Sequence, residues 1–316
     1  MLFLKIAVSG ALLTLLASRL DLRHAWDLGR SASLWWLGAA CGLYVIQLFI
    51  AAWRWGQLLR AQHIEIRARR LFSSCLVALF FNNFLPGTVG GDVIRIRDTA
   101  SLAGSKTLAT TVVALDRVIG LLALVLVGAT AASMSGAGRG VLPFSVGWLW
   151  AGLLVALAVL SVVLVLMSHS TSWLATLRGG RRDWVALRAG RLIDALARFR
   201  TQPGALCGCF AGAVAVHVVL VIFYVAIARS MNVPVSPWNL AVIVPISFII
   251  QALPVSLNGL GVREAAFSVC FARLGLSLES ALAVSLTSAA IAAVVSLLGA
   301  VVYVVRGRST NGREAG

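Results

Sequence analysis

The sequence predicts an all-α polytopic membrane protein, built from two inverted-topology repeats with six full transmembrane helices and two re-entrant helical hairpins. Hydrophobic residues make up 60% of the chain and charged residues only 12%, whereas soluble proteins carry about 25% charged residues. Two similar proline–glycine segments interrupt the apolar runs, and arginine-rich loops alternate with loops of little charge. These three features together predict eight helical membrane segments.

Six apolar runs are long enough to cross a bilayer, which requires about 20 residues. Lys5 lies inside the first run, and no clear small-x-small cleavage pattern follows it. We therefore expect a retained helix rather than a signal peptide at this position. The six runs cover residues 1–18, 33–53, 107–133, 143–167, 204–229 and 280–305.

Arginine is concentrated in three connecting segments: 54–70 with five arginines, 168–203 with seven, and the tail after Val305. The connections 134–142 and 230–238, by contrast, carry one arginine between them. Under the positive-inside rule, the arginine-rich segments and both termini lie in the cytoplasm. The formal charge of +16 comes largely from these short loops. It therefore indicates orientation in a membrane, and no nucleic acid partner is predicted.

Each proline–glycine segment is predicted to turn back within the membrane. Segment 71–106 must begin and end in the cytoplasm, and segment 239–279 must begin and end outside, because the neighbouring spans fix both ends. A short apolar arm, a Leu-Pro break and a return arm then form a re-entrant hairpin surrounded by protein. Eight full spans are the alternative, but the return arms carry many charges. These are Arg95, Arg97, Asp98, Lys106, Arg263, Glu264 and Arg273.

We therefore predict one membrane domain over residues 1–316, with a first inverted repeat at 1–134 and a second at 143–306. The two hairpins, 71–106 and 239–279, would enter from opposite sides and meet near the bilayer midplane, where substrate sites of such repeats lie.

The connection 168–203 is predicted to be a cytoplasmic basic amphipathic segment. Apolar residues recur near helical spacing from Trp184 to Phe199, and most of the arginines fall off that stripe. A helix at 178–203 lying on anionic headgroups fits this pattern. A solvated loop helix is the alternative.

The first break combines turn-forming glycines with charge. Asp92 stands where the return helix needs an N-cap, and Arg95 follows within one turn. A helix start with unpaired N–H groups and an arginine is a suitable phosphate site. Asp92 either caps or pairs with arginine, or it participates directly in transport. The residues singled out here are Asn82, Asn83, Gly87, Gly90, Gly91, Asp92 and Arg95.

The second break repeats this chemistry. Arg263 is the counterpart of Arg95, and an acidic residue follows it directly. The residues singled out here are Ser256, Asn258, Gly259, Gly261, Arg263 and Glu264.

Asp116 and Arg117 lie about ten residues into an apolar helix. A charge at that depth costs several kcal/mol, roughly +3 on insertion scales, unless it faces a cavity or a partner. Adjacent helical positions point about 100° apart, so we do not expect these two side chains simply to neutralise each other. Either Arg117 anchors an anion, with Asp116 as counter-charge or protonatable switch, or both belong to a structural ion-pair network. In the first reading, Arg95, Arg117 and Arg263 form a cationic site for an anionic headgroup.

No catalytic or metal-binding pattern is present in the sequence. The five cysteines lie in apolar runs, and no Ser-His-Asp, metal-ligand or nucleotide-binding spacing occurs. His217, the one histidine inside a predicted span, is expected to be a hydrogen-bonded structural residue. We therefore predict no enzyme activity, no metal and no cofactor.

These motifs resemble the transmembrane flippase domain of bacterial lysylphosphatidylglycerol synthases and its stand-alone relatives. The resemblance covers about residues 1–306. It is carried by Asn83-Phe84-Leu85-Pro86-Gly87, Gly90-Gly91-Asp92 with Arg95, Asp116-Arg117, Pro254-x-Ser256, and Gly259-x-Gly261-Val262-Arg263-Glu264. The family often has Glu-Arg where this chain has Asp116-Arg117, so the acidic side chain is one methylene shorter here.

The resemblance implies a flippase that moves an anionic lipid with a modified headgroup, an aminoacyl-phospholipid or a polyprenyl-phosphate sugar, between leaflets of the bacterial inner membrane. Its implied partners are anionic membrane lipids and a glycosyltransferase or aminoacyl-lipid synthase. We expect a stand-alone member without a soluble aminoacyl-transfer domain. The alternative from another class is a non-transporting membrane subunit that scaffolds a glycosyltransferase or lipid-modifying enzyme.

Overall fold

The structure is a computed structural model, and it describes residues 14, 30, 32–84, 90–135, 140–142, 145–169, 198–199, 201–252, 259 and 261–314. All the regular elements within these residues are helical, which confirms the all-α prediction. The helices are α3 (Leu34–Arg60), α4 (Ala68–Phe84), α5 (Gly90–Ala103), α6 (Lys106–Ser135), α8 (Val146–His169), α11 (Pro203–Ser230), α12 (Pro237–Ala252), α13 (Val262–Arg273) and α14 (Leu278–Glu314).

Five of the predicted spans coincide with long helices. α3, α6, α11 and α14 contain stretches long and apolar enough to cross a membrane. The described apolar part of α8, Val146–Val159, is shorter, although the whole helix has 24 residues. Nearly all of the predicted span 1–18 and of the predicted segment 168–203 lies outside the described residues.

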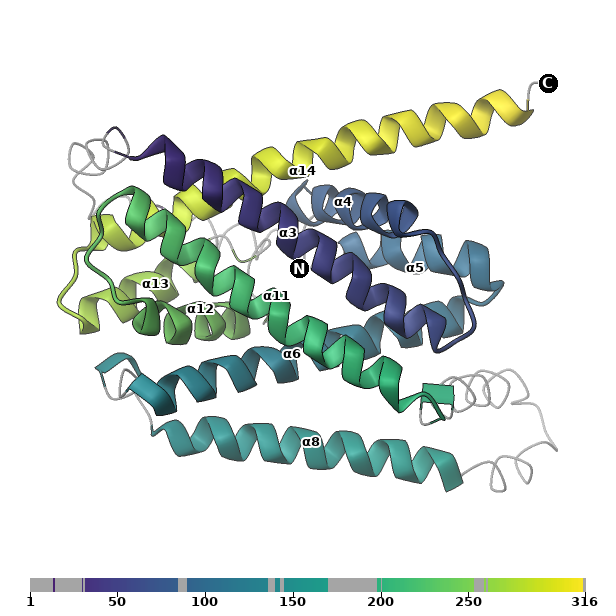
Figure 1. Ribbon diagram of the computed structural model, residues 1–316, viewed down its shortest axis with the longest axis horizontal. Coiled ribbons are helices and arrows are strands. Elements are labelled where there is room, and N and C mark those ends of the chain that lie inside the picture. The colour runs from purple at the N-terminus through teal and green to yellow at the C-terminus, as the bar shows by residue number, and fades with distance from the viewer. Residues whose placement is uncertain are drawn as a thin grey trace.

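The long helices run along the long axis of the molecule (Figure 1). α3 lies antiparallel to α11, and the N–H of Ser33 donates to the carbonyl of Ser230 over 2.8 Å where the two helices begin and end. Small residues permit this close packing, as is usual between membrane helices. A Cβ on Gly212 of α11 would lie only 2.9 Å from the Trp53 ring of α3.

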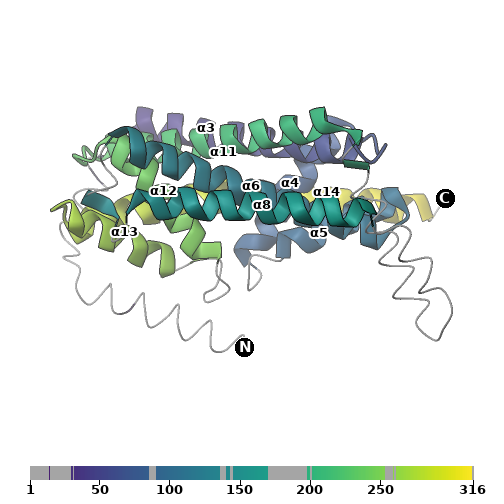
Figure 2. The same cartoon turned by 90° about the horizontal axis from the view of Figure 1, so that it is seen from below.

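Two short-helix pairs, α4–α5 and α12–α13, occupy opposite halves of the long axis (Figures 1 and 2). The first arm of each pair packs on a long helix from the other half of the chain, because a glycine allows close approach. On α14, a Cβ on Gly299 would overlap the Leu76 carbonyl of α4. On α6, a Cβ on Gly128 would lie 3.1 Å from Pro245 of α12.

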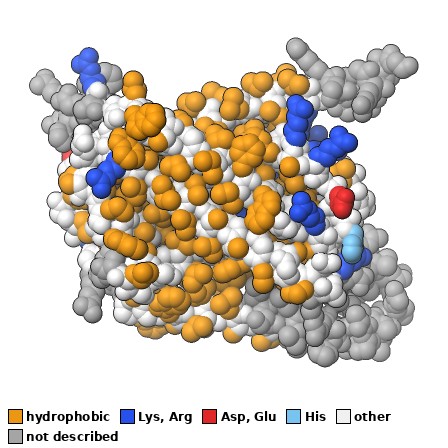
Figure 3. Space-filling view, viewed as in Figure 1, with side chains coloured by type: hydrophobic (Ala, Val, Ile, Leu, Met, Phe, Trp, Pro, Cys, Tyr) orange, Lys and Arg blue, Asp and Glu red, His pale blue; other side chains and the backbone are white. Residues whose placement is uncertain are grey.

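The connections segregate to the two ends of the molecule as the arginine distribution predicted. At one end, Arg306 of α14 pairs with Asp98 of α5 over 3.3 Å and donates to the Arg70 carbonyl at the start of α4. Ser74 of α4 also donates to Asp98, over 2.5 Å. The face of the molecule between the ends is mostly hydrophobic, with charged side chains toward its margins (Figure 3). Such a surface suits a bilayer core flanked by water.

We expect Gly299→Ala to lower the free energy of unfolding by about 1–3 kcal/mol, because the new methyl group overpacks the contact with Leu76. Thermal unfolding in detergent measures this loss. Gly152→Ala on α8 is the matched control, since a Cβ at Gly152 meets nothing within 4 Å. Equal effects of the two substitutions would contradict the close approach of α14 and α4.

Candidate functional site

Asp116 of α6 is the centre of a buried ion-pair network. Its carboxylate is 1% exposed and lies 2.9 Å from the Arg54 Nε and Nη2 atoms of α3. The Arg95 Nη2 atom of α5 also donates to Asp116, over 2.9 Å. One carboxylate therefore holds together three helices. We call Arg54, Asp92, Arg95, Asp116 and Arg117 the first charge cluster.

Arg54 lies inside α3, which continues to Arg60. The prediction that Arg54 begins the basic loop 54–70 is therefore wrong. Glycines on two neighbouring helices make room for its side chain. A Cβ on Gly120 would lie 3.3 Å from the Arg54 Nη1 atom, and a Cβ on Gly212 3.2 Å from its Cβ. The flanking tryptophans, Trp53 and Trp55, were the available signal that the membrane helix continues past residue 53.

Arg95 is buried with one donor unused. Its guanidinium lies over the Trp55 ring, 4.6 Å from the ring centroid, which is a cation–π contact. Within the described part of the chain, the Arg95 Nε atom and the Trp55 Nε1 atom are buried without a hydrogen-bond partner. Unpaired buried donors are rare in proteins and often indicate a ligand or water. Both donors belong to the same stacked pair of side chains.

Arg117 and Asp92 form a third ion pair of the same cluster, between α6 and α5. The Arg117 side chain is 44% exposed and that of Asp92 is 15% exposed, so this pair is much more accessible than Asp116. As expected, Asp116 and Arg117 pair with different partners. The cluster holds three arginines and two aspartates, which leaves one positive charge (+3 − 2).

Of the two roles predicted for Asp92, capping α5 or pairing with arginine, the structure shows the pairing. The helix begins at Gly90, so Asp92 lies in the first turn and uses its carboxylate on Arg117. Asn82 of α4 satisfies the free backbone group instead, because its Oδ1 accepts from the Gly91 N–H over 2.7 Å. Gly91 must lack a side chain, since a Cβ there would lie 2.5 Å from the Ala78 carbonyl.

The other predicted residues of the first break, Asn83 and Gly87, are not part of the first charge cluster. Asn83 donates to the Ala292 carbonyl of α14 over 3.4 Å, which links the hairpin to the last helix. Gly87 lies outside the described residues.

The second charge cluster consists of Arg263 and Glu264 of α13 with Ser285 of α14. Glu264 accepts from Arg263 Nη2 over 2.8 Å and from the Ser285 hydroxyl over 3.0 Å. It also accepts from the Gly261 N–H over 2.7 Å, which caps α13. Gly259 and Gly261 have φ of 78° and 84°, so glycine suits both positions. Ser256 and Asn258 lie outside the described residues.

The structure therefore distributes the three predicted arginines over two clusters. Arg95 and Arg117 belong to the first, whereas Arg263 directs its guanidinium to Glu264 and Ser285. Each of the three is paired with a carboxylate. Among the described residues, no hydrogen bond or ion pair joins Arg263 to the first charge cluster, so the expected site of three guanidinium groups stays a prediction.

His217 has the structural role that was expected of it. Its Nε2 atom lies 2.9 Å from the Gly120 carbonyl, which joins α11 to α6 next to Arg54. No group of three or more His, Cys, Asp or Glu that could hold a metal ion occurs among the described residues.

The family model described as the lysylphosphatidylglycerol synthase TM region matches residues 2–299. The chain belongs to this family. The match spans both charge clusters and both hairpins, and it confirms the resemblance inferred from the two breaks and the Asp116-Arg117 pair. Among curated proteins, no sequence matches the chain. Membership in the family and the apolar helices together establish a multi-pass membrane protein.

Asp116→Asn is expected to lower the free energy of unfolding by about 3–5 kcal/mol, because Arg54 and Arg95 would remain buried without their shared carboxylate. Thermal or denaturant unfolding in detergent measures this change. Asp98→Asn is the matched control, because it breaks a partly exposed pair with Arg306. That control should cost about 1 kcal/mol or less. A larger loss from Asp98→Asn would show that Asp116 is not the central anchor.

Proposed function

We propose that this protein is a flippase that moves an anionic lipid with a modified headgroup between leaflets of the bacterial inner membrane. The observation that carries the proposal is that two largely buried arginines, Arg54 and Arg95, share the one carboxylate of Asp116. An uncompensated buried charge is expensive, so it indicates a ligand of opposite sign. The unused donors on Arg95 and Trp55 support a ligand that accepts hydrogen bonds. A lipid phosphate has both properties.

In this proposal the accessible Asp92–Arg117 pair is the point of entry. A phosphate competes with Asp92 for Arg117, while Asp116 keeps Arg54 and Arg95 in place. The phosphate then receives hydrogen bonds from Arg117 and from the remaining Arg95 donor. The lipid tail stays in the bilayer throughout, so only the headgroup crosses the protein. Because the sequence has no nucleotide-binding motif, an ion gradient, a concentration gradient or downstream consumption drives net movement.

We also propose that the chain consists of two inverted repeats. Supporting this, Arg95 of α5 pairs with Asp116 on the next long helix, and Arg263 of α13 bonds to Ser285 on the next long helix. The separations along the chain are 21 and 22 residues. In the second repeat the carboxylate comes from Glu264, beside the arginine, rather than from the long helix.

The hairpin tips correspond in the same way. Asn82 of α4 closes on Gly91, and the Gln251 side chain of α12 lies where a Cβ on Gly259 would be. Both tips therefore place an amide side chain of the incoming arm against a glycine of the return arm. This repetition supports two re-entrant hairpins that enter from opposite sides.

Cysteine labelling tests the proposed orientation, in which the arginine-rich end is cytoplasmic. In a background without the five native cysteines, we expect a membrane-impermeant maleimide added to spheroplasts to modify Ser236→Cys but not Arg67→Cys. Both positions are exposed, at opposite ends of the molecule. Both should react after the membrane is permeabilised. The reverse pattern in intact spheroplasts would invert the topology.

A liposome assay tests translocation. Purified protein should accelerate the crossing of chemically quenchable phosphatidylglycerol or a polyprenyl-phosphate sugar, and Arg117→Gln should lower the initial rate about tenfold, a loss of roughly 1.4 kcal/mol in transition-state stabilisation. Arg273→Gln is the matched control, since this exposed arginine of α13 lies outside both clusters. An equal loss in both variants would indicate a nonspecific charge effect.

The same preparation separates the flippase from the scaffold alternative. The exposed arginines at one end of the molecule, including Arg67 and Arg69, are the observation that favours a partner-binding surface. If the wild-type protein moves no anionic lipid faster than empty liposomes but retains a glycosyltransferase on purification, the scaffold function replaces the one proposed here.

A further inference from the structure

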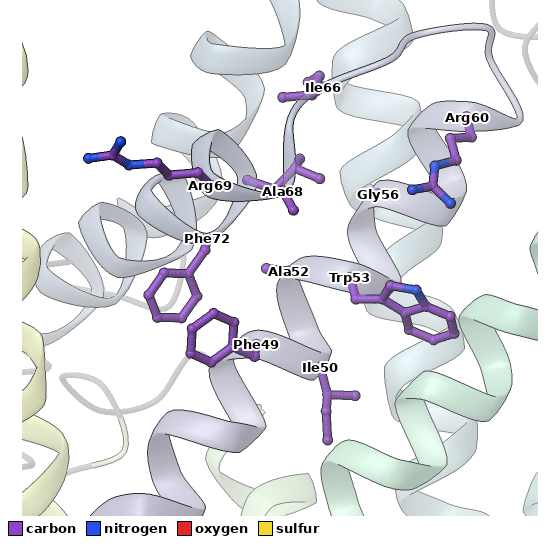
Figure 4. Close-up of a pocket in the computed structure, with 11 residues that line it drawn as sticks. Phe49, Ile50, Ala52, Trp53, Gly56, Arg60, Ile66, Ala68, Arg69 and Phe72 are labelled. Atoms are coloured by element: carbon purple, nitrogen blue, oxygen red, sulfur yellow. The ribbon is translucent and has the colours of Figure 1, made fainter.

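A groove lies between α3 and α4, and none of its lining residues belongs to either charge cluster (Figure 4). Its volume is about 650 Å³, within the range of about 300–1,000 Å³ typical of small-molecule sites. Phe49 of α3 and Phe72 of α4 stack in it with ring centroids 3.8 Å apart. Phe49 is 53% exposed and Trp53 is 48% exposed, so apolar side chains line a groove that is open to the surroundings.

The length of the groove matches one leaflet of a bilayer. It extends along α3 from Phe49 to Arg60. Eleven residues of helix rise about 16 Å at 1.5 Å per residue. The hydrocarbon core of a bilayer is about 30 Å thick, so the groove is about as long as one leaflet is thick. An extended acyl chain of a lipid in one leaflet has a similar length.

Positive charge is confined to the outer end of the groove. Arg60 of α3 and Arg69 of α4 line it from opposite sides, with the Arg69 guanidinium directed away from Arg60, and none of its lining residues is acidic (Figure 4). Both arginines are exposed, and neither forms an ion pair within the part of the chain that the structure describes. The apolar walls suit the acyl chain of a lipid, and the two arginines at one end of the groove suit an anionic headgroup.

We infer that this groove binds one acyl chain of an anionic glycerophospholipid, whose phosphate lies at the end of the groove that carries Arg60 and Arg69. The groove lies on one face of α3, and Arg54 projects from another face of the same helix toward Asp116. A bound lipid therefore fills the α3–α4 seam beside the first charge cluster without entering it. This binding does not require that the protein transports lipid.

Native mass spectrometry of the detergent-purified full chain tests the inference with two probes, phosphatidylglycerol and zwitterionic phosphatidylcholine of the same acyl chains. The wild-type protein should retain phosphatidylglycerol at least about fivefold more than phosphatidylcholine. The double variant Arg60→Gln/Arg69→Gln should lose that preference. Arg67→Gln, an exposed neighbour that does not line the groove, should keep it. A preference that survives in the double variant would overturn the headgroup assignment.

The groove itself is tested by Ala68→Trp, which places a ring in the groove from an exposed position at the start of α4. Retention of phosphatidylglycerol should fall about fivefold, while Ala151→Trp on the exposed face of α8 should leave it unchanged. Undiminished retention in Ala68→Trp would overturn the acyl-chain assignment.

Two chain lengths keep the inference testable if Ala68→Trp does not fold. Dihexanoyl phosphatidylglycerol should bind the wild-type protein at least about fivefold more weakly than the dipalmitoyl lipid, and soluble glycerol 3-phosphate should not displace the latter. Displacement by glycerol 3-phosphate would mean a surface anion site without an acyl-chain groove. Because these readouts measure binding alone, their failure would leave the translocation assay unaffected.

Discussion

The packing of α3, α5 and α6 depends on the ion pairs that Arg54 and Arg95 form with the shared carboxylate of Asp116. This carboxylate is almost fully buried and receives guanidinium groups from two other helices, Arg54 on α3 and Arg95 on α5. A buried charge is stable only when an ion of opposite charge pairs with it, because desolvation costs several kcal/mol per ion. That cost is on the order of the whole stability of a small domain. The position of the first hairpin relative to α3 and α6 is therefore fixed by electrostatics as well as by packing.

Polar side chains and glycines allow the arms of the short-helix pairs to pack closely. Amide side chains satisfy or cover backbone at the tips, as Asn82 does for the Gly91 N–H. Glycines allow the arms to approach their neighbours closely, as Gly299 does against Leu76. In a membrane both devices are necessary, since no water reaches the backbone to complete its hydrogen bonds. These contacts pack the described arms of the two short-helix pairs against each other and against the long helices.

The two clusters differ in a way that bears on their roles. Arg263 and Glu264 balance each other and are nearly buried, and Ser285 completes their hydrogen bonds. The first charge cluster has one positive charge in excess and an accessible pair, Asp92–Arg117, at its edge. The second cluster therefore resembles a structural brace, and the first is the better candidate for contact with an anion. The family to which the chain belongs is consistent with such a membrane role.

The sequence by itself determined the helical class, the places of five of the long helices, and the segregation of the described connections to two ends, although α3 continues to Arg60, past the predicted end at residue 53. These follow from hydropathy and from arginine placement, which act locally along the chain. It also singled out Asp116 and Arg117 as unusual, because charge inside an apolar helix is unusual wherever it occurs. Only the tertiary structure decided the partners. Nothing in the spacing links Arg54 to Asp116 across 62 residues, or separates Arg263 from Arg95 and Arg117. Which charge meets which depends on helix rotation and on the glycine contacts between helices, and these are properties of the packed bundle rather than of any one segment.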